Sequence, residues 1–385
     1  MKEKSKGLLG VVVIAVVLIV GYFALSGGNS TTSPVVDESS DTITIGFMGA
    51  LSGDVAFIGE NVRAAVEIAV EEVNATGGID GKMIEVIYED SGCDSQMGAS
   101  AANKLVNVDR VTAIIGPTCT PAALAAAPIA EEGGVPMISY SATAAAISDA
   151  GDYTFRTAPS DAFQAAFAAD YIYNDLGKTR AVILNCLNDW CQGNADTFAD
   201  NFEGEVLAME TFDVGATDIR SQISKVQAED PDVVYLLAFP TTTVAGIAQM
   251  DELGLNETAL IFGADVMSDP TIWDNLGELG NDVMYTEAAS LEFADSFVLA
   301  MEAKLGEGAV VNVYAPRAYD AVMILAWAMD QAGVDREMIK DTLYILEGYE
   351  GLADSYTFDE NGDPSTASYN VQEVVDGEPT LVETR

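Results

Sequence analysis

The chain has 385 residues, of which 49% are hydrophobic, so it holds enough apolar material for two domains of ordinary size. It carries 61 acidic and 17 basic residues and no histidine, for a net charge of −44. Such a scarcity of cations excludes nucleic acid as a main partner, because binding to a phosphate backbone needs clustered lysine and arginine. With this much apolar material, we interpret the acidic residues as a solvated surface suited to a salty environment.

The N-terminus predicts export. A basic segment over residues 1–7 is expected to stay in the cytoplasm, and an uncharged apolar run over residues 8–25 follows it. The run has 18 residues, and a helix of that length spans about 27 Å, which fits a membrane anchor. Ala24-Leu25-Ser26 also resembles a cleavage site, so a signal segment remains open. In either case the rest faces outward, tethered to the outer face of the membrane or released, with residues 26–41 as a flexible linker.

Four cysteines in an exported chain indicate disulfides rather than a metal site, because zinc normally uses Cys-x-x-Cys pairs or histidines, and the sequence has neither. Closeness in sequence alone pairs Cys186 with Cys191. The absence of histidine also excludes serine-histidine and cysteine-histidine catalysis. We expect no cofactor, no metal and no enzymatic activity.

From residue 42 onward, short runs rich in Val and Ile alternate with longer helical segments. The predicted strands cover residues 43–49, 83–90, 112–116, 136–140, 181–185, 206–212, 232–239 and 259–265. The predicted helices include residues 59–74, 95–108, 120–132, 161–176, 241–253 and 315–331. This alternation predicts an α/β fold with parallel sheets covered on both faces. Because one continuous sheet of so many strands is improbable, we predict two doubly wound lobes joined by a hinge, with ligand in the cleft between them.

Polar residues follow several predicted strands, where doubly wound folds bind ligands. Thr120 is predicted to be the N-cap of a helix whose N-terminal amides suit a carboxylate. Ser141 and Thr143 offer hydroxyl and backbone groups for a zwitterion. Asp265 suits an ammonium group. Each has a plain alternative, as a helix cap or as part of a loop that binds water.

Apolar residues occupy similar positions after other strands. Trp190, Phe239 and Ile58 are candidates for lining an apolar pocket, although aromatic residues are more often ordinary core. In the segment FDENGDP over residues 358–364, Asp359, Asn361 and Asp363 alternate like calcium ligands, but the glycine is misplaced for such a loop, so we interpret the segment as a turn.

Several segments in order resemble the periplasmic leucine/isoleucine/valine-binding proteins, the type I solute-binding proteins of ABC importers. The resemblance runs from about residue 43 to residue 375, and its markers are GFMGALSGDVAFIGENVRAAVEIAVEEVNATGGIDGK, YEDSGCD, ANKLVN, IIGPTCT, MISYSAT, YTFRTAPSD and AYDAVMILAWAM. It implies the type I periplasmic-binding-protein fold. It also implies that the cleft captures an amino acid, leucine, isoleucine or valine, by hinge closure and delivers it to an ABC permease in the membrane.

The resemblance implies roles for single polar residues. Cys93 and Cys119 match the family's disulfide. Thr120 stands where the family has a serine that contacts the ligand carboxylate. Ser141 and Thr143 match the two loop positions that hold the carboxylate and the ammonium.

The remaining matches concern the ammonium site and the apolar wall. Asp265 replaces the glutamate that pairs with the ammonium in close bacterial relatives. Phe239 replaces a tyrosine, Trp190 falls on an aromatic position, and Ile58 replaces an aromatic residue.

The two predicted lobes divide the chain, with the first crossover near Ser160. Lobe 1 is predicted to contain residues 42–160 and 288–367, and lobe 2 to contain residues 161–287 and 368–385, the last beginning with a return strand. We expect a monomer. The alternative function is a ligand-sensing ectodomain, or a binding protein of the same fold, for an amide, urea or other small solute.

Overall fold

The computed structural model describes residues 41–53, 55–289, 295–365 and 367–385. The predicted basic segment, the apolar run over residues 8–25 and the linker up to residue 40 therefore lie outside the described residues. Among the helices within the described ranges, none combines the length and the apolar character needed to cross a membrane.

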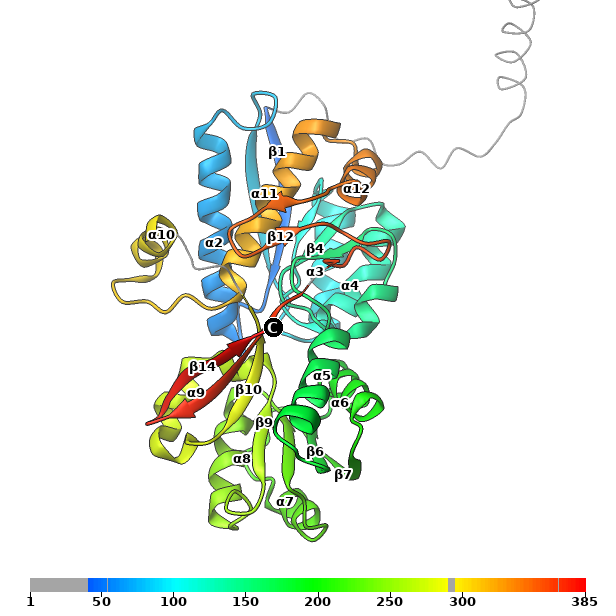
Figure 1. Ribbon diagram of the computed structural model, residues 1–385. Coiled ribbons are helices and arrows are strands. Elements are labelled where there is room, and N and C mark those ends of the chain that lie inside the picture. Colours follow the sequence, from blue (N-terminus) through cyan, green and yellow to red (C-terminus); the bar gives the residue numbers. More distant parts are fainter. Residues whose placement is uncertain (1–40, 54, 290–294, 366) are drawn as a thin grey trace, which may run out of the picture. The chain divides into compact units, whose positions relative to one another are not determined.

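The first sheet consists of parallel strands in the order β2-β1-β3-β4-β5 (Figure 1). Their bounds are β1 (Thr42–Gly49), β2 (Met83–Asp90), β3 (Ile114–Ile115), β4 (Met137–Ser139) and β5 (Thr154–Arg156). Short helical turns, η1 (Lys104–Asp109) and η2 (Ala145–Asp149), precede β3 and β5. We call this sheet, with the helices packed on it, lobe 1.

Helices cover both faces of the first sheet. They are α2 (Ala56–Ala75), α3 (Ser95–Asn103), α4 (Thr120–Gly133), α11 (Tyr314–Ala332) and α12 (Arg336–Tyr344), and α10 (Asp295–Leu305) packs on α2. Ile115 and Ile138 join the buried cluster that contains α2 and α11, whereas Ile114 and Met137 join the cluster that contains α3 and α4. Successive strand residues point to opposite faces, so these short apolar strands are buried on both sides, as a parallel sheet requires.

The second sheet has the order β14-β13-β10-β9-β8-β6-β7 (Figure 1). Its bounds are β6 (Arg180–Cys186), β7 (Glu205–Phe212), β8 (Val233–Leu237), β9 (Leu260–Gly263), β10 (Met284–Ala288), β13 (Tyr369–Val375) and β14 (Glu378–Thr384). The strands from β7 to β10 in this order run parallel. Strand β13 pairs antiparallel with β10, and β14 pairs antiparallel with β13. We call this sheet and its helices lobe 2.

The helices of lobe 2 are α5 (Asp161–Asp170), α6 (Asp189–Asn201), α7 (Arg220–Gln227), α8 (Pro240–Glu252) and α9 (Pro270–Leu276), with the turns η3 (Tyr171–Asp175), η4 (Asp265–Ser268) and η5 (Gly277–Gly280). The chain enters lobe 2 between β5 and α5 and returns to lobe 1 after β10, where α10 and α11 pack on α2. It passes a small hairpin, β11 (Tyr349–Glu350) and β12 (Ser355–Tyr356), before β13. The predicted α/β architecture of two parallel-sheet lobes is confirmed.

Candidate ligand-binding site

A pocket lies between the two lobes at the ends of their strands. Its lining residues are Val55, Ile58, Thr118, Cys119, Thr120, Pro121, Ser141, Thr143, Trp190, Phe239, Asp265, Val266 and Tyr314. The space between them is about 390 Å³ including its opening to solvent. The structure therefore brings together all the residues predicted as ligand contacts: Ile58, Thr120, Ser141, Thr143, Trp190, Phe239 and Asp265.

The N-terminus of α4 forms one wall of the pocket. The helix begins at Thr120, and Cys119, in an extended conformation, occupies the N-cap position without a capping side-chain bond. The predicted N-cap role of Thr120 is therefore wrong, because the chain already turns helical at this residue. Its Oγ1 instead accepts a long bond of 3.4 Å from the Ala144 amide. The free amides of this helix end remain available to the pocket.

The loop that carries Ser141 and Thr143 lies beside this helix end. The Ser141 hydroxyl donates to the Thr118 carbonyl at 2.7 Å, which joins the loop to the segment before α4. The Thr143 carbonyl accepts bonds from Arg156 Nη1 at 2.8 Å and from the Asp161 amide at 2.7 Å. The backbone of the loop is thus fixed from both sides.

Arg156, at the end of β5, anchors that loop from beneath. Its guanidinium is fully buried and forms a bidentate pair with Asp363, at 2.6 Å from Nε and 2.7 Å from Nη2. Asp363 belongs to the FDENGDP segment, which is a turn as predicted, closed by a bond from the Asp359 amide to the Asp363 carbonyl. Gly362 has φ of +75°, and a Cβ there would lie 2.4 Å from the Thr154 carbonyl oxygen, so this turn requires glycine.

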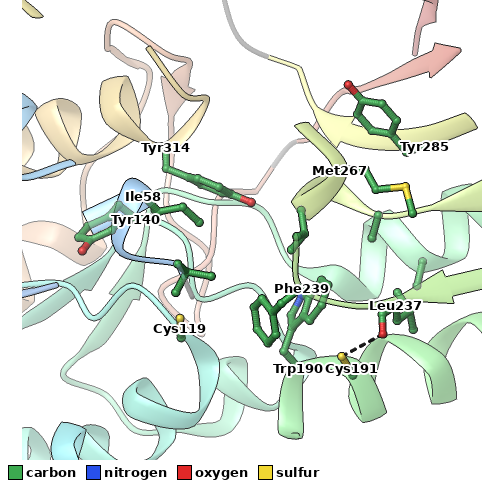
Figure 2. Packing of buried hydrophobic residues seen from close by; sticks show 14 of the residues in the cluster. Ile58, Cys119, Tyr140, Trp190, Cys191, Leu237, Phe239, Met267, Tyr285 and Tyr314 are labelled. Atoms are coloured by element: carbon green, nitrogen blue, oxygen red, sulfur yellow. Dashed lines mark hydrogen bonds between the residues drawn. The ribbon is translucent and has the colours of Figure 1, made fainter. Parts of the chain in front are cut away.

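Two aromatic rings form the wall contributed by lobe 2. Trp190 lies in the first turn of α6, and Phe239 occupies the N-cap position of α8. Their ring centroids are 5.5 Å apart, at an interplanar angle of 37°. Figure 2 shows these rings beside each other, with Ile58 and Tyr314 on the lobe 1 side. This arrangement is a preformed apolar surface for a ligand side chain.

Both predicted disulfides are present. Cys93–Cys119 joins the loop after β2 to the N-cap of α4. Cys186–Cys191 closes a short loop between β6 and α6, next to Trp190. Each bond therefore stabilises a segment that lines the pocket.

Asp265 begins η4 and faces the pocket from lobe 2. Only 5% of it is exposed, its Oδ2 accepts a bond of 2.6 Å from the Tyr314 hydroxyl, and its Oδ1 has no hydrogen-bond partner among the described residues. Burial raises the pKa of the Asp265 carboxyl, and the Tyr314 hydrogen bond and the Arg317 charge act in the opposite direction. Tyr314 was not predicted, because it starts α11 and follows no strand.

Asp161 is a second buried acid near the site that the sequence did not indicate. It is the first residue of α5, is fully buried, and neither of its carboxylate oxygens has a hydrogen-bond partner in the described part of the chain. Burial and the charge of Asp265 raise the pKa of Asp161. Its sequence context, SD-x-x-Q, is typical of an ordinary helix start. The sequence therefore does not predict that the Asp161 side chain points into the protein.

Two lobes closing on a polar and apolar pocket define the class of solute-binding proteins. A sequence profile of the periplasmic binding protein family matches residues 42–378, and the chain belongs to that family. It is accordingly a solute-binding protein of an ABC transporter and not an enzyme.

Known proteins resemble the chain over most of its length. Leu/Ile/Val-binding protein homolog 3 of Brucella melitensis is 26% identical over 341 residues, which cover 87% of this chain and 92% of the relative. The branched-chain amino acid transporter substrate-binding protein LivJ of Streptococcus pneumoniae, solved with isoleucine, is 28% identical with a TM-score of 0.79, over 89% of this chain and 99% of that chain.

A third similarity concerns the fold alone. A solute-binding protein of an ABC transporter from R. palustris, solved with 4-hydroxybenzoate, is 21% identical with a TM-score of 0.79. It covers 89% of this chain and 97% of that chain. Because relatives of one fold bind different solutes, the ligand of this chain has to be argued from its own site.

Proposed function

We propose that the protein captures a branched-chain amino acid, leucine, isoleucine or valine, outside the cell membrane and delivers it to an ABC permease. One observation carries the proposal. The pocket combines a helix N-terminus and hydroxyl groups on lobe 1 with the buried carboxylate of Asp265 on lobe 2, and apolar residues complete its walls. These are the features that a small apolar amino acid needs.

The ligand carboxylate is placed at the start of α4. None of the pocket-lining residues described by the structure is lysine or arginine. The negative charge must then be balanced by dipoles, and a helix N-terminus with its free amides supplies them. Thr120 adds a hydroxyl group at the same end, because its Oγ1 accepts from the Ala144 amide and keeps its own hydrogen to donate. The Ser141 hydroxyl lies beside it and donates to the Thr118 carbonyl.

The ligand ammonium is placed at Asp265. A buried carboxylate with an unpartnered oxygen is costly unless a cation or a donor reaches it. An ammonium group supplies both, and Tyr314, which already donates to the other oxygen, fixes the orientation of the carboxylate. A carboxylic acid without an amino group would leave the Asp265 oxygen unpaired.

The ligand side chain is placed against Trp190, Phe239 and Ile58, which are all buried. Transfer of an aliphatic side chain of three or four carbons to such a surface contributes about 3 kcal/mol. The apolar walls therefore favour leucine, isoleucine and valine over polar amino acids.

Binding couples to closure of the two lobes. Thr120 from lobe 1 and Asp265 from lobe 2 are 2% and 5% exposed, so a ligand enters only when the lobes part. A zwitterion that contacts both lobes binds the closed form more tightly than the open form, and this difference in affinity stabilises the closed form. In this proposal the permease recognises that closed form, and the N-terminal apolar run over residues 8–25 holds the protein at the outer face of the membrane.

Calorimetric titration tests the proposal, after partial unfolding and refolding to remove any carried-over ligand. We expect micromolar or tighter binding of at least one of leucine, isoleucine and valine. We also expect little binding of 4-methylpentanoate, which is leucine without its amino group, or of 3-methylbutylamine, which lacks the carboxylate. The absence of binding to any amino acid would refute the proposal.

A second candidate is an aromatic acid, favoured by the Trp190–Phe239 pair, whose tilted rings can pack on a third ring. Binding of 4-hydroxybenzoate without binding of amino acids would establish it. The buried Asp265 carboxylate argues against this candidate, because an anionic ligand brings no cation to it.

A further inference from the structure

Asp161 is a buried acid that the proposed contacts do not use. Its amide donates to the Thr143 carbonyl at 2.7 Å, which places the start of α5 directly behind a pocket-lining residue. Both of its carboxylate oxygens are buried and lack hydrogen-bond partners among the described residues, as does Oδ1 of Asp265. Together the two acids therefore have three buried carboxylate oxygens without partners among the described residues, two on Asp161 and one on Asp265.

The nearby cations bond elsewhere. Arg156, on β5, forms its bidentate pair with Asp363 and donates to the Thr143 carbonyl. Arg317, on α11, donates to the carbonyls of Val313 at 2.7 Å and Ala289 at 2.9 Å. Both guanidinium groups lower the energy of the charged acids from a distance, but neither bonds to the unpaired oxygens.

The remaining polar groups around the acids are neutral or acidic. Tyr314 of α11 donates to Asp265, Tyr235 of β8 donates to Asn194 Oδ1 at 2.6 Å, and Tyr369 of β13 donates to the Ser160 carbonyl at 3.2 Å.

Glu287, Asn194 and Thr143 are further polar residues near the two acids. Glu287 of β10 accepts a bond of 2.8 Å from Gln372 and adds a second acidic neighbour to Asp265. Burial and the charge of Asp265 raise the pKa of Asp161, and the side chains of Thr143 and Asn194 act in the opposite direction. Among the described residues, no cation bonds to the unpaired oxygens of the two acids.

Two neighbouring carboxylates removed from water cannot both stay ionised without a bonded cation, because desolvation and mutual repulsion both oppose it. Acid pairs of this kind share a proton and titrate together. Burial raises the pKa of both acids, and for Asp161 the charge of Asp265 raises it further.

We propose that Asp161 and Asp265 act as one acid pair, which holds a proton while the pocket is empty and releases it when the ligand's ammonium group arrives. The inference rests on the proposed function and deepens it. In the step, the carboxylic O–H bond breaks, the proton passes to solvent, and the N–H groups of the ammonium take its place as donors. Binding is therefore coupled to proton release and is selective for ligands that carry a cationic donor.

The coupling has a definite sign. Because the bound state holds fewer protons than the free state, affinity rises with pH, by up to about tenfold per pH unit when one full proton is released. A ligand without an ammonium group has no such dependence. Asp161 affects ligand affinity through the proton that it shares with Asp265.

Calorimetry of leucine, isoleucine and valine binding, in two buffers at one pH with different enthalpies of ionisation, measures the released proton directly. We expect between one half and one proton released per ligand for the wild type and none for Asp161→Asn. Glu287→Gln serves as the matched control, since it removes a neighbouring buried acid and should keep the release. Binding enthalpies of the wild type that do not depend on the buffer would overturn the proposal, and so would a release that persists in Asp161→Asn.

A second measurement needs no ligand. The infrared spectrum of the ligand-free wild type at neutral pH should contain a protonated carboxyl band that disappears in Asp161→Asn and persists in Glu287→Gln. If no amino acid binds but this band is present, the proposed function fails and the acid pair stands. If amino acids bind and the band is absent, the pair fails and the proposed function stands.

Discussion

Asp265→Asn is the most informative substitution in the pocket, because it changes the charge of the proposed ammonium partner and almost nothing of its shape. Asp265 is 5% exposed, with Oδ2 bonded to Tyr314 and Oδ1 free to meet the ligand. In the variant, an ammonium group would face a neutral amide where the wild type has a carboxylate. We therefore expect a large loss of affinity without a loss of stability.

The expected magnitude follows from this burial. Removing one partner of a buried, hydrogen-bonded charge pair costs about 2–5 kcal/mol of binding free energy, which corresponds to a roughly 30-fold to several thousand-fold rise in Kd. Tyr314→Phe removes one supporting hydrogen bond, about 0.5–1.5 kcal/mol, and should weaken binding only about two- to tenfold. The ligand-free Asp265→Asn protein should unfold at the same or a higher urea concentration, since a buried charge has been removed.

Asp320→Asn is a matched control outside the pocket. Asp320 is also a buried carboxylate, but it accepts bonds from the amides of Leu352 at 2.6 Å and Ala353 at 2.8 Å and from the Tyr356 hydroxyl at 2.9 Å. An amide nitrogen in place of one oxygen would face these donors, so we expect a loss of about 1–3 kcal/mol of stability with unchanged affinity. The assays are calorimetric titration with leucine, isoleucine and valine, and urea unfolding.

The opposite pattern would refute the reasoning. Unchanged affinity in Asp265→Asn for the amino acid that binds the wild type would show that the ammonium lies elsewhere in the pocket. A large loss of stability in the same variant would show that Asp265 is structural.

Three further predictions concern the walls and supports of the pocket. Ile58→Ala removes part of the apolar wall and so enlarges the pocket. The affinity for phenylalanine relative to leucine should therefore rise in competition titrations, and an unchanged ratio would place the ligand side chain elsewhere. Arg156→Ala leaves Asp363 buried without its partner, so the free energy of unfolding in urea should fall by about 3–5 kcal/mol. Replacing both Cys186 and Cys191 by serine should lower stability by only about 2 kcal/mol, because the closed loop is short. Affinity should fall as well, and full affinity in this double variant would show that the loop needs no covalent closure.

Much of the site could be predicted from the sequence because of one topological rule. In a doubly wound lobe the carboxyl ends of parallel strands meet at one edge, so residues that follow Val- and Ile-rich runs converge. This rule and the family resemblance together indicated Thr120, Ser141, Phe239 and Asp265, which are distant in sequence and line one pocket. The position of each side chain in sequence was more informative than its type.

Residues outside that rule were missed. Tyr314 starts a helix after a long connection, and Asp161 has the appearance of an ordinary acid in a first helical turn. Their inward direction depends on how α5 and α11 pack, which no local pattern encodes. Strands β5 and β10 were also missed, since neither Thr154–Arg156 nor Met284–Ala288 contains Val or Ile.

A crystal structure of the protein grown with leucine tests the central claim most directly. The account predicts closed lobes, the ammonium within hydrogen-bonding distance of Asp265 Oδ1, the carboxylate at the N-terminus of α4, and the side chain against Trp190 and Phe239. A ligand in the reverse orientation, or a pocket that stays empty at saturating leucine, isoleucine and valine, would contradict it.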